Sequence, residues 1–194
     1  MKLYYAPGAC SLADHIAMHE AGLKFDRVKV DLKNKVAEDG RPFDEINPKS
    51  YVPVVELDDG HTLTENIAIL SWVAKQAPDL APSNDKDGIK LLEMLAFIST
   101  EIHKQFGRVL RPTSDAEAAA AKEKIDKRFS LIATMMKGDY LFGDSMSVAD
   151  AYLFTMLTWA KKLGVEMPSK LQAFYDRVRE RPAVKLAFEH EGLQ

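Results

Sequence analysis

The single cysteine of the chain, Cys10, lies where a short apolar run gives way to a predicted helix, and Ser11 follows it. A thiolate at the N-terminus of a helix is stabilised by the helix dipole, so a cysteine in this position can be reactive. A lone cysteine is more often a small buried hydrophobic residue. Because no second cysteine is present, an intrachain disulfide and a dithiol oxidoreductase mechanism are excluded, whereas chemistry with an external thiol is not.

Thr64, Glu65 and Asn66 open a second predicted helix. The unpaired backbone N–H groups and the dipole at such a helix start attract anions. Without a ligand the same residue types form an ordinary N-cap, which is their commoner use. The segment is therefore either an anion site or a helix start without a ligand.

His15 and His19 are four residues apart on one predicted helix, a spacing that metal ligands use. No glutamate stands where a zinc-binding H-E-x-x-H motif needs one, and no third ligand is evident. We therefore predict a structural pair and no bound metal. Lys35, in a polar loop, and His103, on a later helix, also have common non-catalytic roles, as a solvated charge and as a surface or capping histidine.

Composition narrows the function classes. The 194 residues are 46% hydrophobic and 28% charged, which is ordinary for one large folded domain or two small ones. The net charge of −3 offers no basic excess, so we expect no nucleic-acid partner. No stretch approaches the roughly 20 apolar residues of a membrane helix, and the N-terminus lacks the apolar region of a signal peptide. We expect no membrane partner and a cytoplasmic location.

Residues 1–77 alternate the patterns of strands and helices, apart from a poorly patterned stretch that ends at Pro48. The patterns predict, in order, a strand over 2–5, a helix over 11–21, a strand over 25–30, a hairpin over 52–63 turning at Asp59-Gly60, and a helix over 64–77. This order of β-α-β, then a hairpin, then α, is typical of a thioredoxin-like α/β domain.

Residues 78–86 contain two prolines and little periodicity, which predicts an interdomain linker. Residues 87–194 have helical periodicity, so we predict an all-helical second domain. Ser147 and Asp150 have the spacing of a capping box, which favours a folding role for Asp150 over a catalytic one.

Five segments of the sequence resemble bacterial glutathione transferases of the beta class. In chain order they are YYAPGACSL, NPKSYVPVVELDDGHTLTENIAI, EIHKQF, SVADAYLFTMLTWA and RERPAVKLAFEHEGL. Together they cover the chain from Met1 to about Gln194. The resemblance implies a thioredoxin-like glutathione-binding domain followed by a helical-bundle domain, whereas composition and periodicity alone indicate only an α/β domain followed by helices.

The resemblance implies a glutathione site built largely from the first domain. A cis peptide bond between Val52 and Pro53 would let the N–H and C=O of Val52 pair with the cysteinyl part of glutathione. The helix start at Glu65 and Asn66 would bind the γ-glutamyl carboxylate, with the Glu65 carboxylate facing the γ-glutamyl ammonium. Lys35 would pair with the glycyl carboxylate.

The resemblance also implies the groups around the reacting sulfur. Cys10 would contact the glutathione thiol and be able to form a mixed disulfide with it, and the Ser11 hydroxyl or nearby N–H groups would activate that thiol. His103 would lie near the thiol or the glycyl end, with Thr100 and Lys104 close by. A neutral imidazole would accept the thiol proton, and a charged one would stabilise the thiolate.

Two positions depart from the family pattern. Asn66 stands where Ser or Gly is more usual, although its amide can still donate to a carboxylate. Ala96 stands where the class often carries Asn, so a polar contact with glutathione is missing unless Ser99 replaces it.

We therefore predict a glutathione transferase that conjugates glutathione, as co-substrate, to small hydrophobic electrophiles, a detoxification activity. Apolar residues near Phe106 and Val109 are expected to line the electrophile pocket. The resemblance implies a homodimer, and the helix over 89–109 has an apolar face that fits its interface. The alternatives are glutathione-dependent thiol-disulfide exchange or peroxidase-like activity through Cys10, isomerase or dehalogenase chemistry on the same scaffold, and a non-catalytic glutathione- or ligand-binding module.

Overall fold

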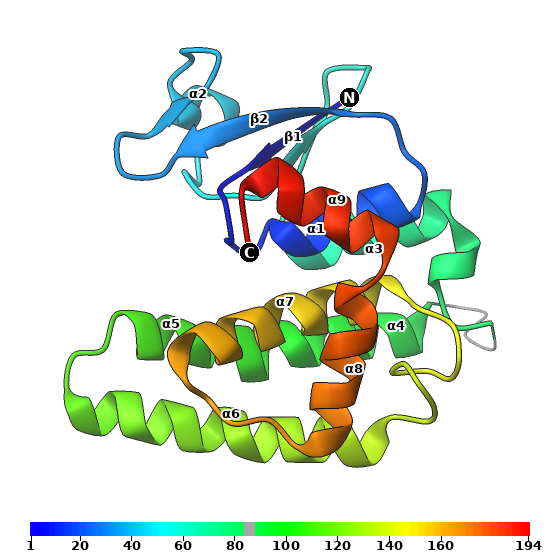
Figure 1. Ribbon diagram of the computed structural model, residues 1–194. Helices are drawn as coiled ribbons and strands as arrows, with labels where there is room; N and C mark the ends of the chain where they lie inside the picture. Colours follow the sequence, from blue (N-terminus) through cyan, green and yellow to red (C-terminus); the bar gives the residue numbers. More distant parts are fainter. Residues whose placement is uncertain (84–87) are drawn as a thin grey trace. The chain divides into compact units, whose positions relative to one another are not determined.

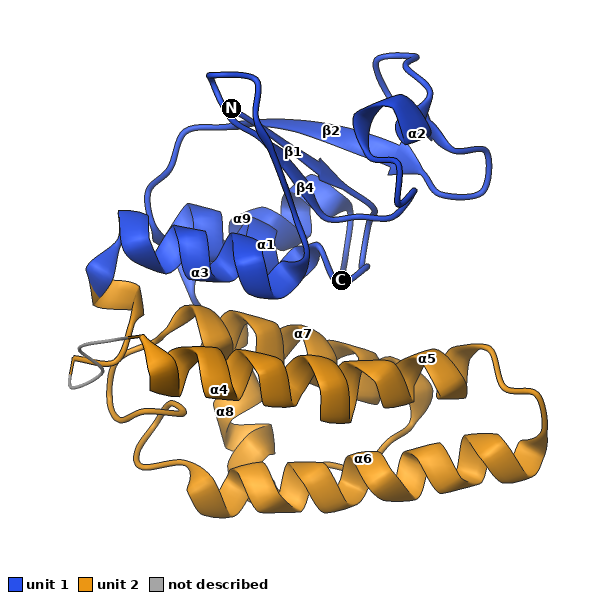
Figure 2. Cartoon of the chain, turned by 180° about the vertical axis from the view of Figure 1, so that it is seen from behind, with its two compact units in different colours: residues 1–78, 181–194 blue, residues 79–180 orange. Residues whose placement is uncertain are grey.

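The computed structural model describes residues 1–83 and 88–194, which form two compact units (Figures 1 and 2). Unit 1 comprises Met1–Pro78 and Arg181–Gln194, and unit 2 comprises Asp79–Glu180. Unit 1 thus includes residues 181–194, which the sequence analysis assigned to the second domain, expected over 87–194. Pro78–Leu80 forms a short 3-10 helix, and residues 84–86 of the expected linker lie outside the described residues.

Five strands of unit 1 form one sheet in the order β3-β2-β1-β4-β5. They are β1 (Lys2–Tyr5), β2 (Asp26–Asp31), β3 (Val36–Ala37), β4 (Val54–Glu56) and β5 (Thr62–Thr64). β1 pairs in parallel with β2 and antiparallel with β4. A parallel pair needs a crossover, and α1 (Leu12–Glu20) supplies it. The thioredoxin-like order predicted from the sequence is confirmed.

Both faces of this sheet are covered. Tyr4 lies opposite Val28 and Val54 in the strand register and shares one buried cluster with them and with Phe43 of α2 (Phe43–Ile46). Because side chains alternate along a strand, Leu3 points to the opposite face. There α1 and α3 (Asn66–Gln76) pack, and α9 (Pro182–Glu191) lies beside α1 (Figure 1).

The differences from the predicted elements in unit 1 are local. β3 and α2 occur in the poorly patterned stretch before Pro48, since elements of two and four residues are too short to show a period. The helix expected over 64–77 begins at Asn66, because Thr64 completes β5 and Glu65 turns the chain.

Unit 2 is helical, as predicted. Its helices are α4 (Ile89–Phe97), α5 (Lys104–Leu110), α6 (Asp115–Met135), α7 (Val148–Leu163) and α8 (Ser169–Arg179). Between α4 and α5 the helix widens into a π-helical segment, Ile98–His103. Segments of this kind are rare and occur frequently at functional sites.

Asp150 has the predicted capping role at the start of α7. Its carboxylate accepts hydrogen bonds from the N–H and hydroxyl of Ser147, at 2.8 and 2.7 Å, and from the N–H of Leu141 at 2.9 Å. Among the described residues, none of the helices combines the length and apolarity that a membrane span requires.

Candidate functional site

Cys10 and the Val52–Pro53 turn lie next to each other in unit 1. The peptide bond between Val52 and Pro53 is cis, as the resemblance implied. The thiol of Cys10, which is partly exposed, donates a hydrogen bond to the carbonyl oxygen of Val52 at 3.5 Å. The two segments expected to meet at the sulfur of a bound thiol are therefore in contact.

The thiol of Cys10 is not acidic. Burial, followed by the charge of Asp14, raises its pKa to about 12, although the N–H groups of Cys10 and Ser11 act in the opposite direction. The helix N–H groups lower the pKa, as the sequence led us to expect, but desolvation outweighs them. At neutral pH this group is a protonated thiol that donates a hydrogen bond.

Ser11 is fully buried at the turn between β1 and α1. Its hydroxyl accepts from the N–H of Ala6 at 3.3 Å and donates to the carbonyl oxygen of Ala6 at 3.4 Å. With its donor and its acceptor both engaged, the hydroxyl is not directed at a ligand. This arrangement argues against direct activation of a thiol by Ser11 and gives the residue a role in positioning Cys10.

Asn66 turns inward and connects two helix starts. Its side-chain nitrogen donates to the carbonyl oxygen of Cys10 at 2.9 Å and to Oδ2 of Asp14 at 2.8 Å. A side-chain amide has two N–H groups, so both are used. In this arrangement the amide is not offered to a ligand carboxylate, unlike the expectation from the sequence. The backbone N–H groups at the start of α3 are left for that role.

Glu65 has its carboxylate exposed at the end of β5. Its Oε1 accepts from Lys49 Nζ and from the Tyr51 hydroxyl, each at 2.6 Å. These two hydrogen bonds, that of Lys49 first, hold the pKa of Glu65 below its ordinary value. Lys49 and Tyr51 did not emerge from the sequence as site residues, although both belong to the NPKSYVP segment that carries the resemblance.

Lys35 extends to the same loop, where its Nζ donates to the carbonyl oxygen of Ser50 at 2.6 Å. Ser50, Tyr51 and Val52 are consecutive, and each contacts a different expected site residue: Lys35, Glu65 and Cys10, respectively. We call residues 50–52 the hub loop. It brings together three residues that lie far apart in the sequence.

Backbone strain concentrates at the same place. Lys35 and Ser50 each have φ of 56°, and Glu65 has φ of 72°. Among the described residues these are the non-glycine positions with positive φ. Such conformations cost on the order of 1–3 kcal/mol each and cluster at ligand-binding sites. One of the three lies in the hub loop and the other two contact it, which favours this region as a candidate binding site.

The remaining expected residues belong to unit 2. Ser99, Thr100 and His103 lie on the π-helical segment, and Lys104 begins α5. Ser99 is partly exposed, Thr100 and Lys104 are exposed, and the Thr100 hydroxyl donates to the carbonyl oxygen of Ala96 at 2.9 Å.

His103 is a neutral imidazole at physiological pH. Its Nδ1 lies 2.7 Å from the hydroxyl of Tyr152, and its ring meets those of Tyr152 and Trp159 edge to face. Burial lowers its pKa to about 4. Of the two roles that the sequence left open, proton acceptance agrees with this protonation state and stabilisation by a charged ring does not.

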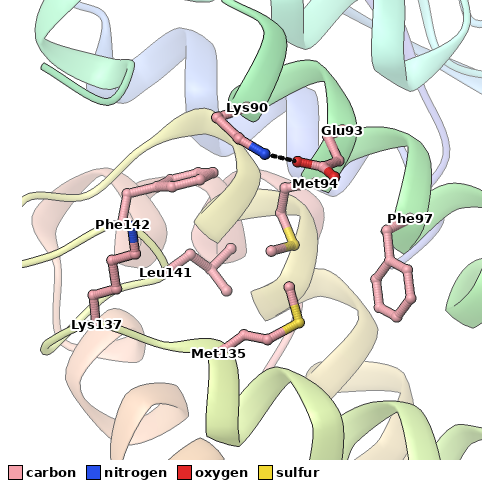
Figure 3. Close-up of a pocket in the computed structure, with 8 residues that line it drawn as sticks. All are labelled: Lys90, Glu93, Met94, Phe97, Met135, Lys137, Leu141 and Phe142. Atoms are coloured by element: carbon pink, nitrogen blue, oxygen red, sulfur yellow. Dashed lines mark hydrogen bonds and ion pairs between the residues drawn. The ribbon is translucent and has the colours of Figure 1, made fainter. Parts of the chain in front are cut away.

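Unit 2 also contains a pocket of about 500 Å³ between α4 and the segments around Met135 and Leu141 (Figure 3). Its lining combines apolar side chains with the ion pair of Lys90 and Glu93, 2.8 Å long. Neither Phe106 nor Val109 lines it. Phe106 is fully buried, in contact with Phe129 and Trp159, whereas Val109 is partly exposed. The electrophile pocket predicted near these two residues stays a prediction.

Comparison with known families gives matches in both units. The family described as "Glutathione S-transferase, N-terminal domain" matches residues 9–76. The family described as "Glutathione S-transferase, C-terminal domain" matches residues 91–182. Each unit therefore has the fold of its counterpart in those proteins.

Individual relatives match over the full length. The chain is 41% identical to glutathione S-transferase GstA of Escherichia coli O157:H7 over 201 residues, covering 100% of both chains. A sphingomonad glutathione S-transferase solved in complex with glutathione is 42% identical, with a TM-score of 0.92 and full coverage of both chains. A beta class enzyme from Sphingomonas chungbukensis is 41% identical, also with a TM-score of 0.92 and full coverage.

Proposed function

Because the chain belongs to the beta class of the glutathione S-transferase family, we propose that it conjugates glutathione to small hydrophobic electrophiles and binds glutathione at the hub loop of unit 1. One observation carries the assignment of the site: residues 50–52 contact Lys35, Glu65 and Cys10 in turn. Glutathione is an extended tripeptide with a carboxylate near each end, an ammonium group and a central thiol. The residues around the hub loop have groups that complement each of these.

The charges at the hub loop match the tripeptide. Lys35 provides a cation for the glycyl carboxylate, a partly exposed pair worth about 1 kcal/mol or less. The Glu65 carboxylate accepts from the γ-glutamyl ammonium, which takes the place of one of its present donors. Lys49 and the backbone N–H groups at the start of α3 then face the γ-glutamyl carboxylate.

The thiol of Cys10 acts as a hydrogen-bond donor to the bound sulfur. When the cysteinyl part of glutathione pairs with Val52, the Cys10 thiol exchanges its bond to the Val52 carbonyl oxygen for a bond to the glutathione sulfur. A protonated donor favours the anionic form of its acceptor and so lowers the pKa of the glutathione thiol. The thiolate then attacks the electrophile, forming a C–S bond while the leaving group departs or the ring opens.

The protonation state of Cys10 favours conjugation over thiol-disulfide exchange through this residue. Thiol-disulfide exchange initiated by Cys10 needs a thiolate, and its pKa of about 12 leaves almost none at neutral pH. Exchange and peroxidase-like chemistry through Cys10 are therefore the weaker hypotheses for this chain.

The test combines binding and turnover. Calorimetry should give saturable glutathione binding, and steady-state rates with aryl halides, epoxides and disulfides should show turnover with at least one class of carbon electrophile. Cys10→Ser retains a hydrogen-bond donor and should keep conjugation while losing any exchange activity. Absence of saturable binding at millimolar glutathione would refute the proposed site. Binding without turnover would instead support a glutathione-binding module.

The proposal also includes residues of unit 2. We propose that Ser99, Thr100, His103 and Lys104 contribute to glutathione binding, with His103 accepting the thiol proton. Single alanine variants, and His103→Gln, should raise the KM for glutathione or lower kcat, while an exposed change on α6, Lys124→Ala, should do neither.

We further propose a homodimer. Ile89 and Leu92 of α4 leave 59% and 45% of their surfaces exposed, and residues three apart share one face of a helix. Light scattering after gel filtration should give twice the chain mass, and Leu92→Glu should weaken the dimer if this face forms the interface. A cytoplasmic location also remains a prediction, which cell fractionation tests.

A further inference from the structure

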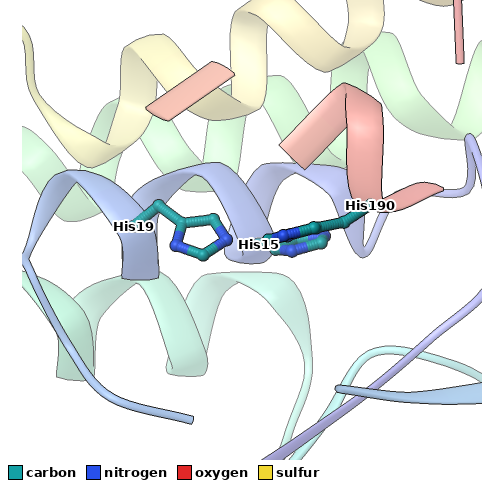
Figure 4. Close-up of side chains that lie close together, drawn as sticks. All are labelled: His15, His19 and His190. Atoms are coloured by element: carbon teal, nitrogen blue, oxygen red, sulfur yellow. The ribbon is translucent and has the colours of Figure 1, made fainter. Parts of the chain in front are cut away.

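Three histidines from opposite ends of the chain meet in unit 1, away from the hub loop in sequence and in contacts (Figure 4). His15 and His19 lie on α1, and His190 lies near the end of α9. Their ring centroids are separated by 4.9 Å (His15 to His19), 5.3 Å (His19 to His190) and 5.6 Å (His15 to His190). The sequence suggested only the first two as a pair, and the fold supplies the third.

One nitrogen of each ring is buried without a hydrogen-bond partner. Among the side chains of the described residues, these nitrogens are Nε2 of His15, Nε2 of His19 and Nδ1 of His190. Buried polar atoms are nearly always paired, and each unpaired one calls for an explanation. Three on adjacent rings have a common explanation if one ligand binds all of them.

The arrangement of a fourth residue agrees with such a ligand. Nδ1 of the fully buried His15 lies 2.9 Å from Oε1 of Glu191. Histidines that bind a metal through one nitrogen almost always use the other to bond a carboxylate or carbonyl group. Glu191 therefore orients the His15 ring and leaves Nε2 as its ligand atom.

We propose that His15, His19 and His190 bind one divalent transition-metal ion, with Zn²⁺ as the ion that best fits the three imidazoles and a water molecule in the fourth position. Imidazole nitrogen suits Zn²⁺, and three protein ligands with one open position are a common zinc arrangement. One nitrogen from each ring lies within 4.8 Å of the other two.

Binding requires the rings to close on the ion. At Zn–N distances of about 2.0–2.1 Å, tetrahedral nitrogens lie about 3.4 Å apart. The present separations of up to 4.8 Å shorten by rotation of His19 and His190, which are both partly exposed, around the fixed ring of His15. A pocket of about 420 Å³ lined by His19, Leu23 and Phe25 provides access from the surface.

The charges around the cluster act in both directions. Arg27 lies near enough to all three rings to disfavour their protonated forms and would also oppose a bound cation. Glu191, which contacts His15 at 2.9 Å, offsets this charge only in part, because burial raises its pKa to about 7. Burial and Arg27 lower the pKa of His15 to about 4, and burial and the neighbouring rings lower that of His19 to about 4. His15 and His19 are thus neutral at physiological pH, as metal ligands must be, and burial also lowers the pKa of His190.

A bound ion would link α9 to α1 through its three ligands. The contact between α9 and α1 already includes the ion pair of Arg181 and Glu20, at 2.5 Å. An ion held by His15, His19 and His190 binds the folded chain and not the unfolded one, so it raises thermal stability. None of its three ligands belongs to the residues proposed to bind glutathione.

The experiment is a titration of the untagged chain with Zn²⁺ and with Co²⁺, whose visible absorption reports a four-coordinate site. We expect one ion per chain and a rise in Tm. His19→Gln and His190→Gln should each weaken ion binding by more than about 100-fold. Changing a residue that contacts a ligand but not the ion costs only about 10–100-fold. Glu191→Gln should weaken it by about 10–100-fold.

Two matched controls identify the ligands. His61, on the β-hairpin, has 80% of its side chain exposed, so His61→Gln should bind the ion as the wild type does. Cys10→Ser should also bind as the wild type does, which excludes the thiol as a ligand. Since variants of the cluster can misfold, X-ray absorption of the wild-type chain provides an independent measurement. It should show three imidazole nitrogens and no sulfur around the ion.

The proposal is overturned if the wild-type chain shows no saturable ion binding. It is also overturned if His19→Gln and His190→Gln both bind with wild-type affinity, or if X-ray absorption finds sulfur or fewer than three imidazoles. Each of these outcomes leaves glutathione binding and turnover untouched.

Discussion

The side-chain amide of Asn66 donates to the carbonyl oxygen of Cys10 at 2.9 Å, which joins the start of α3 to the residue that faces the expected sulfur site. The same nitrogen donates to Asp14, whose carboxyl is fully buried and whose pKa burial holds well above the usual range. Asn66 therefore helps to fix the position of Cys10 and at the same time donates a hydrogen bond to one oxygen of a buried acid.

Asn66→Ala should lower the free energy of unfolding by about 1–3 kcal/mol, because it leaves buried acceptors without their donor. Urea denaturation measures the change, and calorimetry should show weaker glutathione binding in the same variant. Asn34→Ala removes an exposed amide of the same unit and should change stability by no more than about 0.5 kcal/mol. Equal effects of the two substitutions would contradict the structural role of Asn66.

Alkylation of Cys10 by iodoacetamide should be slow at neutral pH and should rise about tenfold per pH unit from pH 7 upward, because only the thiolate reacts. Because the pKa is about 12, the alkylation rate should not reach a plateau in the accessible pH range. The urea-unfolded chain is the control and should titrate near the ordinary pKa of about 8.5. A folded chain that reaches its maximal rate by pH 8 would show that Cys10 is a thiolate after all.

Glu65→Gln should raise the Kd for glutathione by about 10–100-fold, since it removes a hydrogen bond between charged groups worth about 1.5–3 kcal/mol. Lys35→Ala should raise it about fivefold or less, and this smaller effect should fade at high salt because exposed charges are screened. Lys33→Ala, in the same exposed loop, is the matched control. If Lys33→Ala weakens binding as much as Lys35→Ala, the effect reflects general charge and not a specific contact.

The pH profile of kcat/KM should have the same shape in the wild type and in His103→Gln between about pH 5 and 8. His103 loses its proton near pH 4, so it is neutral throughout this range. Its removal should lower the rate by about 100-fold or more if the ring accepts the thiol proton. An inflection near pH 6.5 that disappears in the variant would indicate a charged imidazole.

Asp150→Asn should become less destabilising as the pH rises. Burial raises the pKa of Asp150 from 3.8 to about 6 in the folded chain. Because the pKa is higher in the folded chain than in the unfolded one, protonated Asp150 stabilises the fold. This contribution is fully present below about pH 3.8 and is lost as the pH rises through about 6. Urea unfolding at several pH values measures the difference between variant and wild type. A difference that stays constant from pH 4 to 7 would refute the shift, and Asp126→Asn on α6 is an exposed control.

The amino-acid sequence by itself determined the order of elements and the family. Periodicity of two or nearly four residues, glycine at a helix end and Asp-Gly at a hairpin are local signals, so β1, α1, the hairpin and the helices of unit 2 could be predicted from them. The two short elements before Pro48 could not, because Phe43 is buried by contacts with distant strands and not by a local pattern.

The tertiary structure decided what each site residue does. Cys10 and Asn66 were identified from the sequence, but burial makes the thiol weakly acidic and turns the amide toward Cys10 and Asp14. Desolvation and hydrogen-bond partners depend on side chains that the fold brings from elsewhere in the chain, which local spacing does not encode. For the same reason His190 joins His15 and His19 only when α9 packs against α1.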